Sequence, residues 1–118
     1  MMLRKLKTIR RSILAASALL LINLSGTVQA ADIAAGRVKA DQVCSACHGK
    51  DGNTPIDPSY PRLAGQHADF LYYVLVDYKV DRRKNAIMSA QAKQLSQEDM
   101  KNLAAYYASM PGQLSHKR

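Results

Sequence analysis

The pattern of apolar and polar positions predicts helices rather than strands along most of the chain. Asp32 is a suitable N-cap for a first helix that runs to about Val43. Gly36, Ala40 and Cys44 recur every four residues and give that helix a narrow stripe of small side chains. Such a stripe lets a second helix approach closely, which explains a glycine that otherwise costs about 1 kcal/mol in a helix interior.

Two further helices are predicted in the second half of the chain. Residues 68–80 include a run of β-branched and aromatic side chains that would suit a strand. However, their apolar positions also recur at helical spacing, and no partner strand is visible, so we expect a helix. Ser96, with Asp99 three residues later, resembles a capping box and predicts a last helix that ends near Ser109.

The segments between these helices are expected to be irregular. Residues 49–65 contain three prolines and three glycines, which indicates a loop that can wrap a flat ligand. Residues 81–84 are charged and are expected to end the second helix. Residues 85–92 are expected to form a loop or short turn that carries Met88.

The most specific chemical signal lies at the end of the first predicted helix. Cys44 and Cys47 are separated by two residues, and His48 follows directly. Two thiols at this spacing can each add to one vinyl group of a haem, and the imidazole can take an axial position on the iron. The pattern predicts one covalently attached haem c, held by Cys44 and Cys47 and ligated by His48.

Three other uses of the cysteines remain open at this point. A thioredoxin-type pair needs a βαβ setting, whereas the flanks here are Ala-rich and helical. A structural zinc site needs two more ligands, and only His67 and His116 remain, 19 and 68 positions beyond His48. A simple disulfide gives no reason for the histidine.

The first 30 residues have the layout of an export signal. A basic stretch precedes an apolar run over residues 13–24, and Val28-Gln29-Ala30 has the small-residue pattern of a cleavage site. A run of twelve residues is too short to span a bilayer. We therefore expect cleavage near Ala30, a periplasmic location and one domain over residues 31–118, with an uncleaved N-terminal anchor as the alternative.

Removal of the signal changes the charge and leaves a small domain. The whole chain has a net charge of +8, but residues 31–118 hold only 12 basic and 9 acidic residues, a net charge of +3. This charge is too weak to indicate nucleic-acid binding, and it fits either a patch that steers acidic partners or an ordinary solvated surface. With one Phe and no Trp in the chain, a buried porphyrin would supply missing apolar surface, so we expect the haem-free chain to be largely unfolded.

In the order and spacing of its motifs, the chain resembles the class I c-type cytochromes. It is most similar to the small bacterial mono-haem members, which resemble one half of the di-haem periplasmic cytochromes. The resemblance covers nearly all of residues 34–110 and implies an all-α fold of three to five helices wrapped around one haem, with Gly36 meeting Tyr106 where the first and last helices cross. The residues that carry it are Gly36 to Cys44, Cys47-His48-Gly49, Asp51-Gly52-Asn53, Pro61 to Gln66, Tyr78-Lys79, Arg83, Asn85, Met88, Leu95-Ser96 and Leu103 to Ser109.

The resemblance also implies residues around the cofactor. It points to Met88 as the second axial ligand, with Met100 and Met110 as rivals in this sequence. The Pro61 carbonyl is expected to accept the Nδ1–H of the axial histidine. The family often has Gly where this chain has Asp81. Leu63, Tyr60 and Leu71 are expected to pack against the haem. Arg83 is expected to pair with a haem propionate, and Asn85 to orient the loop that carries Met88. For Arg83 and Asn85, plain surface solvation is the alternative.

A His/Met-ligated iron has no open position and keeps its ligands in both oxidation states, which suits an electron carrier rather than an enzyme. We therefore predict a periplasmic, monomeric carrier of single electrons between transient redox-protein donors and acceptors. Peripheral membrane complexes are included among the expected partners. One alternative is a haem-bearing electron-transfer subunit of a larger dehydrogenase or oxidase complex. Another is an enzyme or gas sensor, which requires that Met88 is not a ligand.

Overall fold

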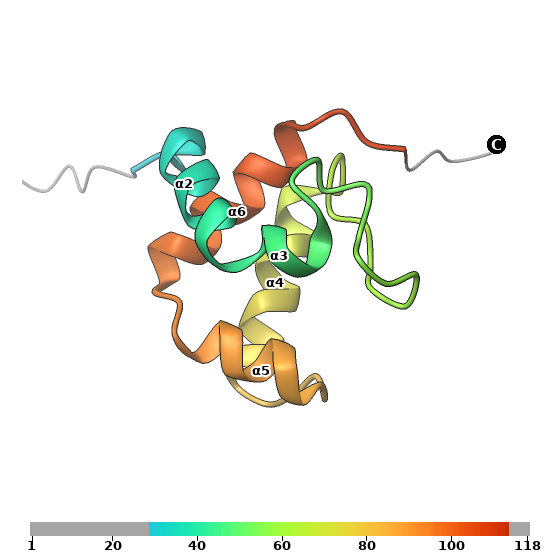
Figure 1. Ribbon diagram of the computed structural model, residues 1–118. Coiled ribbons are helices and arrows are strands. Elements are labelled where there is room, and N and C mark those ends of the chain that lie inside the picture. Colours follow the sequence, from blue (N-terminus) through green and yellow to red (C-terminus); the bar gives the residue numbers. More distant parts are fainter. Residues whose placement is uncertain (1–28, 114–118) are drawn as a thin grey trace, which may run out of the picture. The chain divides into compact units, whose positions relative to one another are not determined.

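The computed structural model describes residues 29–113, so nearly all of the predicted export signal lies outside the described residues. All regular structure in this range is helical, which confirms the all-α prediction (Figure 1). None of the helices in this range is long and apolar enough to cross a membrane. The helices are α2 (Ile33–Val43), α3 (Ser45–His48), α4 (Ala68–Lys79), α5 (Ala86–Lys93) and α6 (Gln97–Ser109).

Helices α2 and α6 cross at the glycine that the sequence singles out (Figure 1). A Cβ on Gly36 would lie 2.1 Å from the carbonyl oxygen of Asn102 and 2.9 Å from the Cβ of Tyr106, so only glycine allows this approach. The predicted meeting of Gly36 and Tyr106 is confirmed. The Asp32 side chain caps α2 by accepting from the Ala35 amide at 3.0 Å, and the Asp32 amide donates to Asn102 Oδ1 at 2.7 Å.

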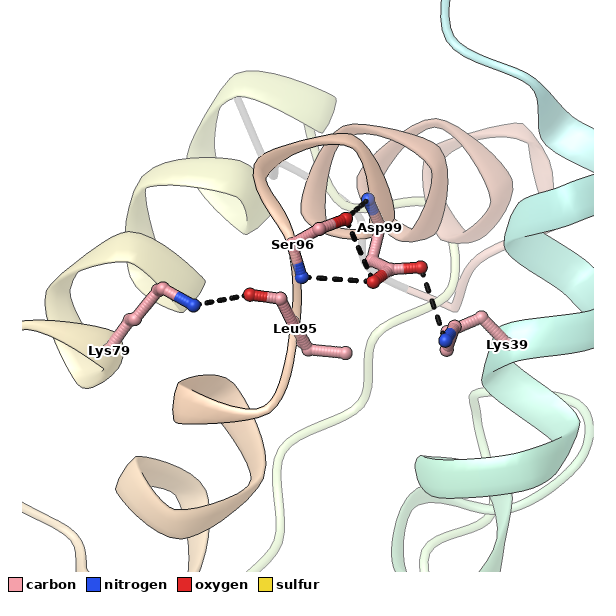
Figure 2. A network of polar contacts seen from close by, with 5 residues as sticks. All are labelled: Lys39, Lys79, Leu95, Ser96 and Asp99. Carbon is pink, nitrogen blue, oxygen red and sulfur yellow. Dashed lines mark hydrogen bonds and ion pairs between the residues drawn. The ribbon is translucent and has the colours of Figure 1, made fainter.

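The start of α6 is a capping box that also contacts α2 (Figure 2). Ser96 Oγ accepts from the Asp99 amide at 2.9 Å, and Asp99 Oδ2 accepts from the Ser96 amide at 2.9 Å, which confirms the predicted box. Asp99 Oδ1 pairs with Lys39 Nζ of α2 at 3.2 Å. One carboxylate therefore joins the end of one helix to the side of another, while the Lys79 ammonium donates to the Leu95 carbonyl just before the box.

The hydrophobic core lies between α2, α4 and α6, and it is small. Among the described residues, Leu103 is the one large side chain that is less than 2 % exposed. Met100 is 3 % exposed, which confirms its predicted core role. The buried cluster consists of Ala40, Leu71, Leu95, Met100, Leu103, Ala104 and Tyr107.

The prediction of a loop over residues 85–92 is wrong, because this stretch forms α5. The Asn85 side chain accepts from the Met88 amide at 3.0 Å and caps the helix, a role that the sequence reading missed. The turn before it contains Asp81 at φ +57°, in the left-handed region. Glycine adopts this conformation more readily than aspartate. This explains why the related proteins often have glycine at the position of Asp81.

The predicted irregular segment after the cysteine motif is confirmed as a loop that runs from Gly49 to His67. It is folded back on itself, because the Gly52 carbonyl accepts from the amides of Leu63 at 2.8 Å and Ala64 at 3.0 Å. The Gly65 amide then donates to the Tyr107 carbonyl near the end of α6 at 2.9 Å. These bonds hold the loop against the last helix, and the Ile56 amide joins it to the cysteine motif by donating to the Cys47 carbonyl at 3.1 Å.

Candidate haem attachment site

The cysteine motif forms a single helical turn that continues α2. Cys44 ends α2, with its amide 2.9 Å from the Ala40 carbonyl, and it also caps α3. The amides of Cys47 and His48 both donate to the Cys44 carbonyl, at 3.1 and 3.0 Å. Both thiols are free and half-buried. The turn therefore presents two free thiols and one imidazole from a short, hydrogen-bonded stretch of backbone.

The imidazole of His48 is held by the loop that follows it. The ring is buried, at 6 % exposed, and its Nδ1 lies 2.9 Å from the Pro61 carbonyl oxygen. A carbonyl oxygen can only accept, so Nδ1 carries the proton and the lone pair of the neutral ring is on Nε2. Such a carbonyl partner fixes both tautomer and orientation in metal-ligating histidines. The Tyr60 ring lies beside it, with 6.2 Å between centroids.

The environment of Cys44 disfavours thiolate chemistry. Burial raises the pKa of the Cys44 thiol to about 11. A thioredoxin-type pair needs the opposite shift, because its nucleophile is the thiolate. Within residues 29–113, no three His, Cys, Asp or Glu side chains converge to hold a metal ion. The surroundings of the two sulfurs therefore favour attachment of an organic group through carbon–sulfur bonds. Such attachment does not require converging ligands.

Met88 lies in the first turn of α5 and is half-buried. Asn85 fixes this turn by accepting from the Met88 amide, so the residue expected to orient a loop instead caps a helix. The rival Met100 is enclosed in the core, and Met110 packs against the core at the end of α6. Of these three methionines, Met88 is the one outside the core cluster and its packed neighbours.

The other predicted contact residues have protein partners of their own. Arg83 Nε donates to the Tyr78 hydroxyl at 2.9 Å, and its guanidinium carbon lies 5.3 Å from the centre of that ring. Leu63 is partly buried against the core cluster, and Leu71 belongs to the cluster. Tyr78, which positions Arg83, was not among the predicted site residues.

Tyr107 is a second residue that the sequence reading missed as part of the site. Tyr107 is 3 % exposed, and its hydroxyl oxygen is buried without a hydrogen-bond partner. Among the described residues, it is the one buried side-chain polar atom of this kind. Burial and the neighbouring Cys44 raise the pKa of this phenol, so it stays a neutral donor. A buried tyrosine ordinarily finds a partner for its hydroxyl. The sequence showed only that Tyr107 lies on the apolar face of α6.

These residues fit a covalently bound haem. The turn offers two free sulfurs, the buried His48 has its Nε2 lone pair free, and the Tyr107 hydroxyl has a donor to spare. The protein core is thin, and among its buried side chains Leu103 is the one large residue of 29–113 that is less than 2 % exposed. A large apolar group that completes the core would bury more surface than these side chains do by themselves.

A C-x-x-C-H turn of this kind, within an all-helical fold, defines a c-type cytochrome. Residues 31–106 match the protein family described as "Cytochrome C oxidase, cbb3-type, subunit III". The chain therefore belongs to the cytochrome c family, as a class I c-type cytochrome, and haem c is its cofactor.

Three known proteins illustrate the relationship. Cytochrome c4 from Thiocapsa roseopersicina is 45% identical over 83 residues, which cover 70% of this chain and 42% of that protein. Cytochrome c-554(548) from Halomonas halodenitrificans is 43% identical over 83 residues, covering 68% of this chain and 98% of that protein. The crystal structure of reduced recombinant cytochrome c4 from Pseudomonas stutzeri superimposes with a TM-score of 0.65 at 37% identity, covering 72% of this chain and 48% of that one.

These matches confirm the class I cytochrome fold and the predicted similarity to one half of a larger cytochrome. The chain spans about half the length of the cytochrome c4 proteins it matches, between 42% and 54%. It spans nearly all of the shorter Halomonas protein.

Proposed function

We propose that the protein is an exported, periplasmic mono-haem cytochrome that carries single electrons between transient redox-protein partners. In this proposal Cys44 and Cys47 attach the haem, and His48 and Met88 are the axial ligands. Residues 1–30 are the cleaved signal. The observation that carries the proposal is the hydrogen bond between His48 and Pro61, because it leaves Nε2 as the ligating nitrogen.

The chain's own residues hold the site rigid. When bound, the haem supplies an iron that cycles between the ferric and ferrous states. The Pro61 carbonyl keeps the imidazole in one tautomer, and the Asn85 cap fixes the backbone of Met88. If His48 and Met88 both held the iron, no position on it would be left for a substrate. This arrangement supports an electron carrier rather than an enzyme.

The cofactor is tested on the exported protein from cells that can mature c-type cytochromes. We expect a mass equal to that of the polypeptide after cleavage near Ala30 plus one haem, and a c-type pyridine haemochrome spectrum. A mass equal to the bare polypeptide would overturn the proposal. A shortfall of haem in Cys44→Ser or Cys47→Ser locates the attachment.

The second axial ligand is tested by comparing methionine variants. We expect Met88→Ala to lose the far-red methionine-to-Fe(III) charge-transfer band, to bind carbon monoxide when reduced, and to have a lower reduction potential. Met110→Ala, a methionine at the end of α6, is the matched control and should keep the band. Loss of the band in the control alone would assign the ligand to Met110.

A second candidate function is a haem-bearing subunit of a larger dehydrogenase or oxidase complex. The matched family is itself described as a subunit of an oxidase, and this favours the alternative. Size-exclusion chromatography of a periplasmic extract, followed by the haem absorbance, separates the two proposals. A carrier elutes as a small monomer, whereas a subunit elutes with its complex at low and high salt.

A further inference from the structure

The net charge of the predicted mature domain is concentrated in one short stretch. Residues 77–93 hold five basic and two acidic residues, whereas the remaining positions of 31–118 hold seven of each. The whole excess of +3 is therefore contributed by 17 consecutive positions. In contrast, residues 39–51, which include the cysteine motif, hold two basic and two acidic residues and are neutral.

This stretch forms one end of the described unit, made of the last turn of α4, the turn after it and α5 (Figure 1). Its two carboxylates pair with two of its cations. Among residues 29–113, no carboxylate lies within ion-pair distance of Arg83 or Lys84, so their charges remain available to a partner. The two pairs are Arg82 Nη2 with Asp77 Oδ1 at 2.8 Å and Lys93 Nζ with Asp81 Oδ2 at 2.7 Å.

The same end also exposes apolar side chains. Val80 and Ile87 are 51 % and 56 % exposed. A hollow of about 430 Å³ lies between the turn and α5, with Lys84 and Lys93 in its lining. We call the surface of Val80, Arg82, Arg83, Lys84, Ile87 and Lys93 the α4–α5 face. Exposed apolar side chains at the same end of the molecule as exposed cations are typical of a protein docking surface, in which charges steer the encounter and apolar contacts stabilise the complex.

We propose that the α4–α5 face docks the acidic face of a redox-protein partner. The inference rests on the proposed electron-carrier function, and it places docking at α5, where Ile87 directly precedes Met88. Each encounter moves one electron from the reduced partner to the oxidised cytochrome, and no covalent bond forms. A second copy is a poor occupant, since two faces with the same net positive charge repel when they meet symmetrically. The neutral stretch around the cysteines offers no comparable attraction.

The charge argument is tested with two charge-reversal variants of the full-length haem-loaded protein. Arg82→Glu with Lys84→Glu alters the α4–α5 face. Arg37→Glu with Lys101→Glu, both exposed on other helices, makes the same change in net charge elsewhere. The probe is reduced flavodoxin, an acidic one-electron donor, and stopped-flow absorbance gives the second-order rate constant. We expect the first variant to be about tenfold slower than wild type at an ionic strength of about 10 mM, and the second less than about twofold slower. The difference should vanish at about 0.5 M salt.

The apolar part is tested with Ile87→Ser, for which Ile56→Ser is the control because Ile56 is 71 % exposed in the loop after the cysteine motif. We expect Ile87→Ser to slow the reaction about threefold at both ionic strengths, and the control to leave it unchanged. Equal slowing by the two charge-reversal variants, or slowing by neither, would overturn the proposal.

Other occupants give distinct results. If wild type co-sediments with vesicles of phosphatidylglycerol and phosphatidylcholine, and the Arg82→Glu, Lys84→Glu variant does not, the face binds lipid instead. A dimer in analytical ultracentrifugation that this variant abolishes would assign the face to a second copy. Failure of the wild-type protein to undergo reversible reduction by dithionite would overturn the electron-carrier proposal itself, separately from the docking face.

Discussion

Gly65 and Gly112 touch through their backbones. A Cβ on Gly65 would lie 2.6 Å from the Cα of Gly112, and a Cβ on Gly112 would lie 2.5 Å from the Ala64 carbonyl oxygen. Gly65 also has φ +73°, in the left-handed region that favours glycine. The loop that holds His48 through Pro61 is thereby closed against the segment that follows α6. The geometry around the imidazole thus depends on a contact between two residues that lie far apart in sequence.

Substitution of Gly65 by alanine should therefore destabilise the protein. The Cβ would displace the Gly112 backbone and would also occupy an unfavourable φ, so we expect a loss of about 2–4 kcal/mol in the free energy of unfolding. Chemical denaturation of the haem-loaded protein, followed by haem absorbance, measures it. Lys50→Ala, an exposed loop position, is the control and should stay within about 0.5 kcal/mol of wild type. A Gly65→Ala protein as stable as wild type would show that the loop does not depend on this contact.

The capping box of α6 predicts a pH dependence of stability. The Ser96 amide, chiefly, together with the Ser96 hydroxyl and Lys39, holds the pKa of Asp99 below its usual range. The ionised carboxylate is therefore favoured in the fold, and its contribution is present above the ordinary pKa and is lost as the pH falls through the lowered one. We expect Asp99→Asn to lose about 1 kcal/mol at pH 7 and to differ little from wild type near pH 3. Thermal unfolding at the two pH values measures this, with Glu98→Gln in the same turn as the control. A difference that is the same at both pH values would contradict the role of the charge.

The sequence predicted the three longer helices, α4 from helical periodicity alone and α2 and α6 also from a side-chain cap at the start. Asp32 and Ser96 are caps followed by helical periodicity, and both are found in the structure. α5 was missed for two reasons. It is only eight residues long, so helical periodicity is hard to detect, and its N-cap is Asn85, a residue type that is also common in turns. In the site, the spacing of Cys44, Cys47 and His48 was readable because the chemistry is local.

Long-range relationships in the site could not be read in the same way. The contact between Pro61 and His48 was expected from the family resemblance, not from any local rule. The unpartnered hydroxyl of Tyr107 could not be predicted, because hydrogen-bond satisfaction depends on which atoms the tertiary fold places around a side chain. Sequence patterns specify which face of α6 is apolar, but they do not specify where a single polar atom on that face points.

Tyr107 leads to a prediction about the haem-loaded protein. Buried donors in native proteins are nearly always satisfied, and the porphyrin edge next to Cys44 has no oxygen or nitrogen acceptor. We therefore expect the hydroxyl to donate to the neighbouring Cys44 sulfur, which keeps its lone pairs in the thioether. Tyr107→Phe should then lower the free energy of unfolding of the haem-loaded protein by about 1 kcal/mol. Tyr72→Phe, whose hydroxyl accepts from Gln97 Nε2 at the surface at 3.1 Å, is the control for loss of an exposed hydrogen bond and should have a smaller effect. A Tyr107→Phe protein that is more stable than wild type would show that the hydroxyl has no partner even with haem bound.

The two thiols report whether the chain folds before haem is attached. In the folded chain the pKa of Cys44 is raised to about 11 by burial, so its thiolate fraction at pH 8 would be about a hundredfold smaller than that of an ordinary cysteine. We expect the haem-free chain to be largely unfolded, and iodoacetamide should therefore alkylate Cys44 and Cys47 at similar rates at pH 8, as followed by mass spectrometry of the peptides. The single-cysteine variants Cys44→Ala and Cys47→Ala give the reference rates in about 6 M guanidinium. The contrary result would be a Cys44 that reacts slowly in buffer and rapidly in guanidinium, and that approaches the rate of Cys47 only as the pH rises toward 11. This result would show that the polypeptide reaches its fold without the cofactor.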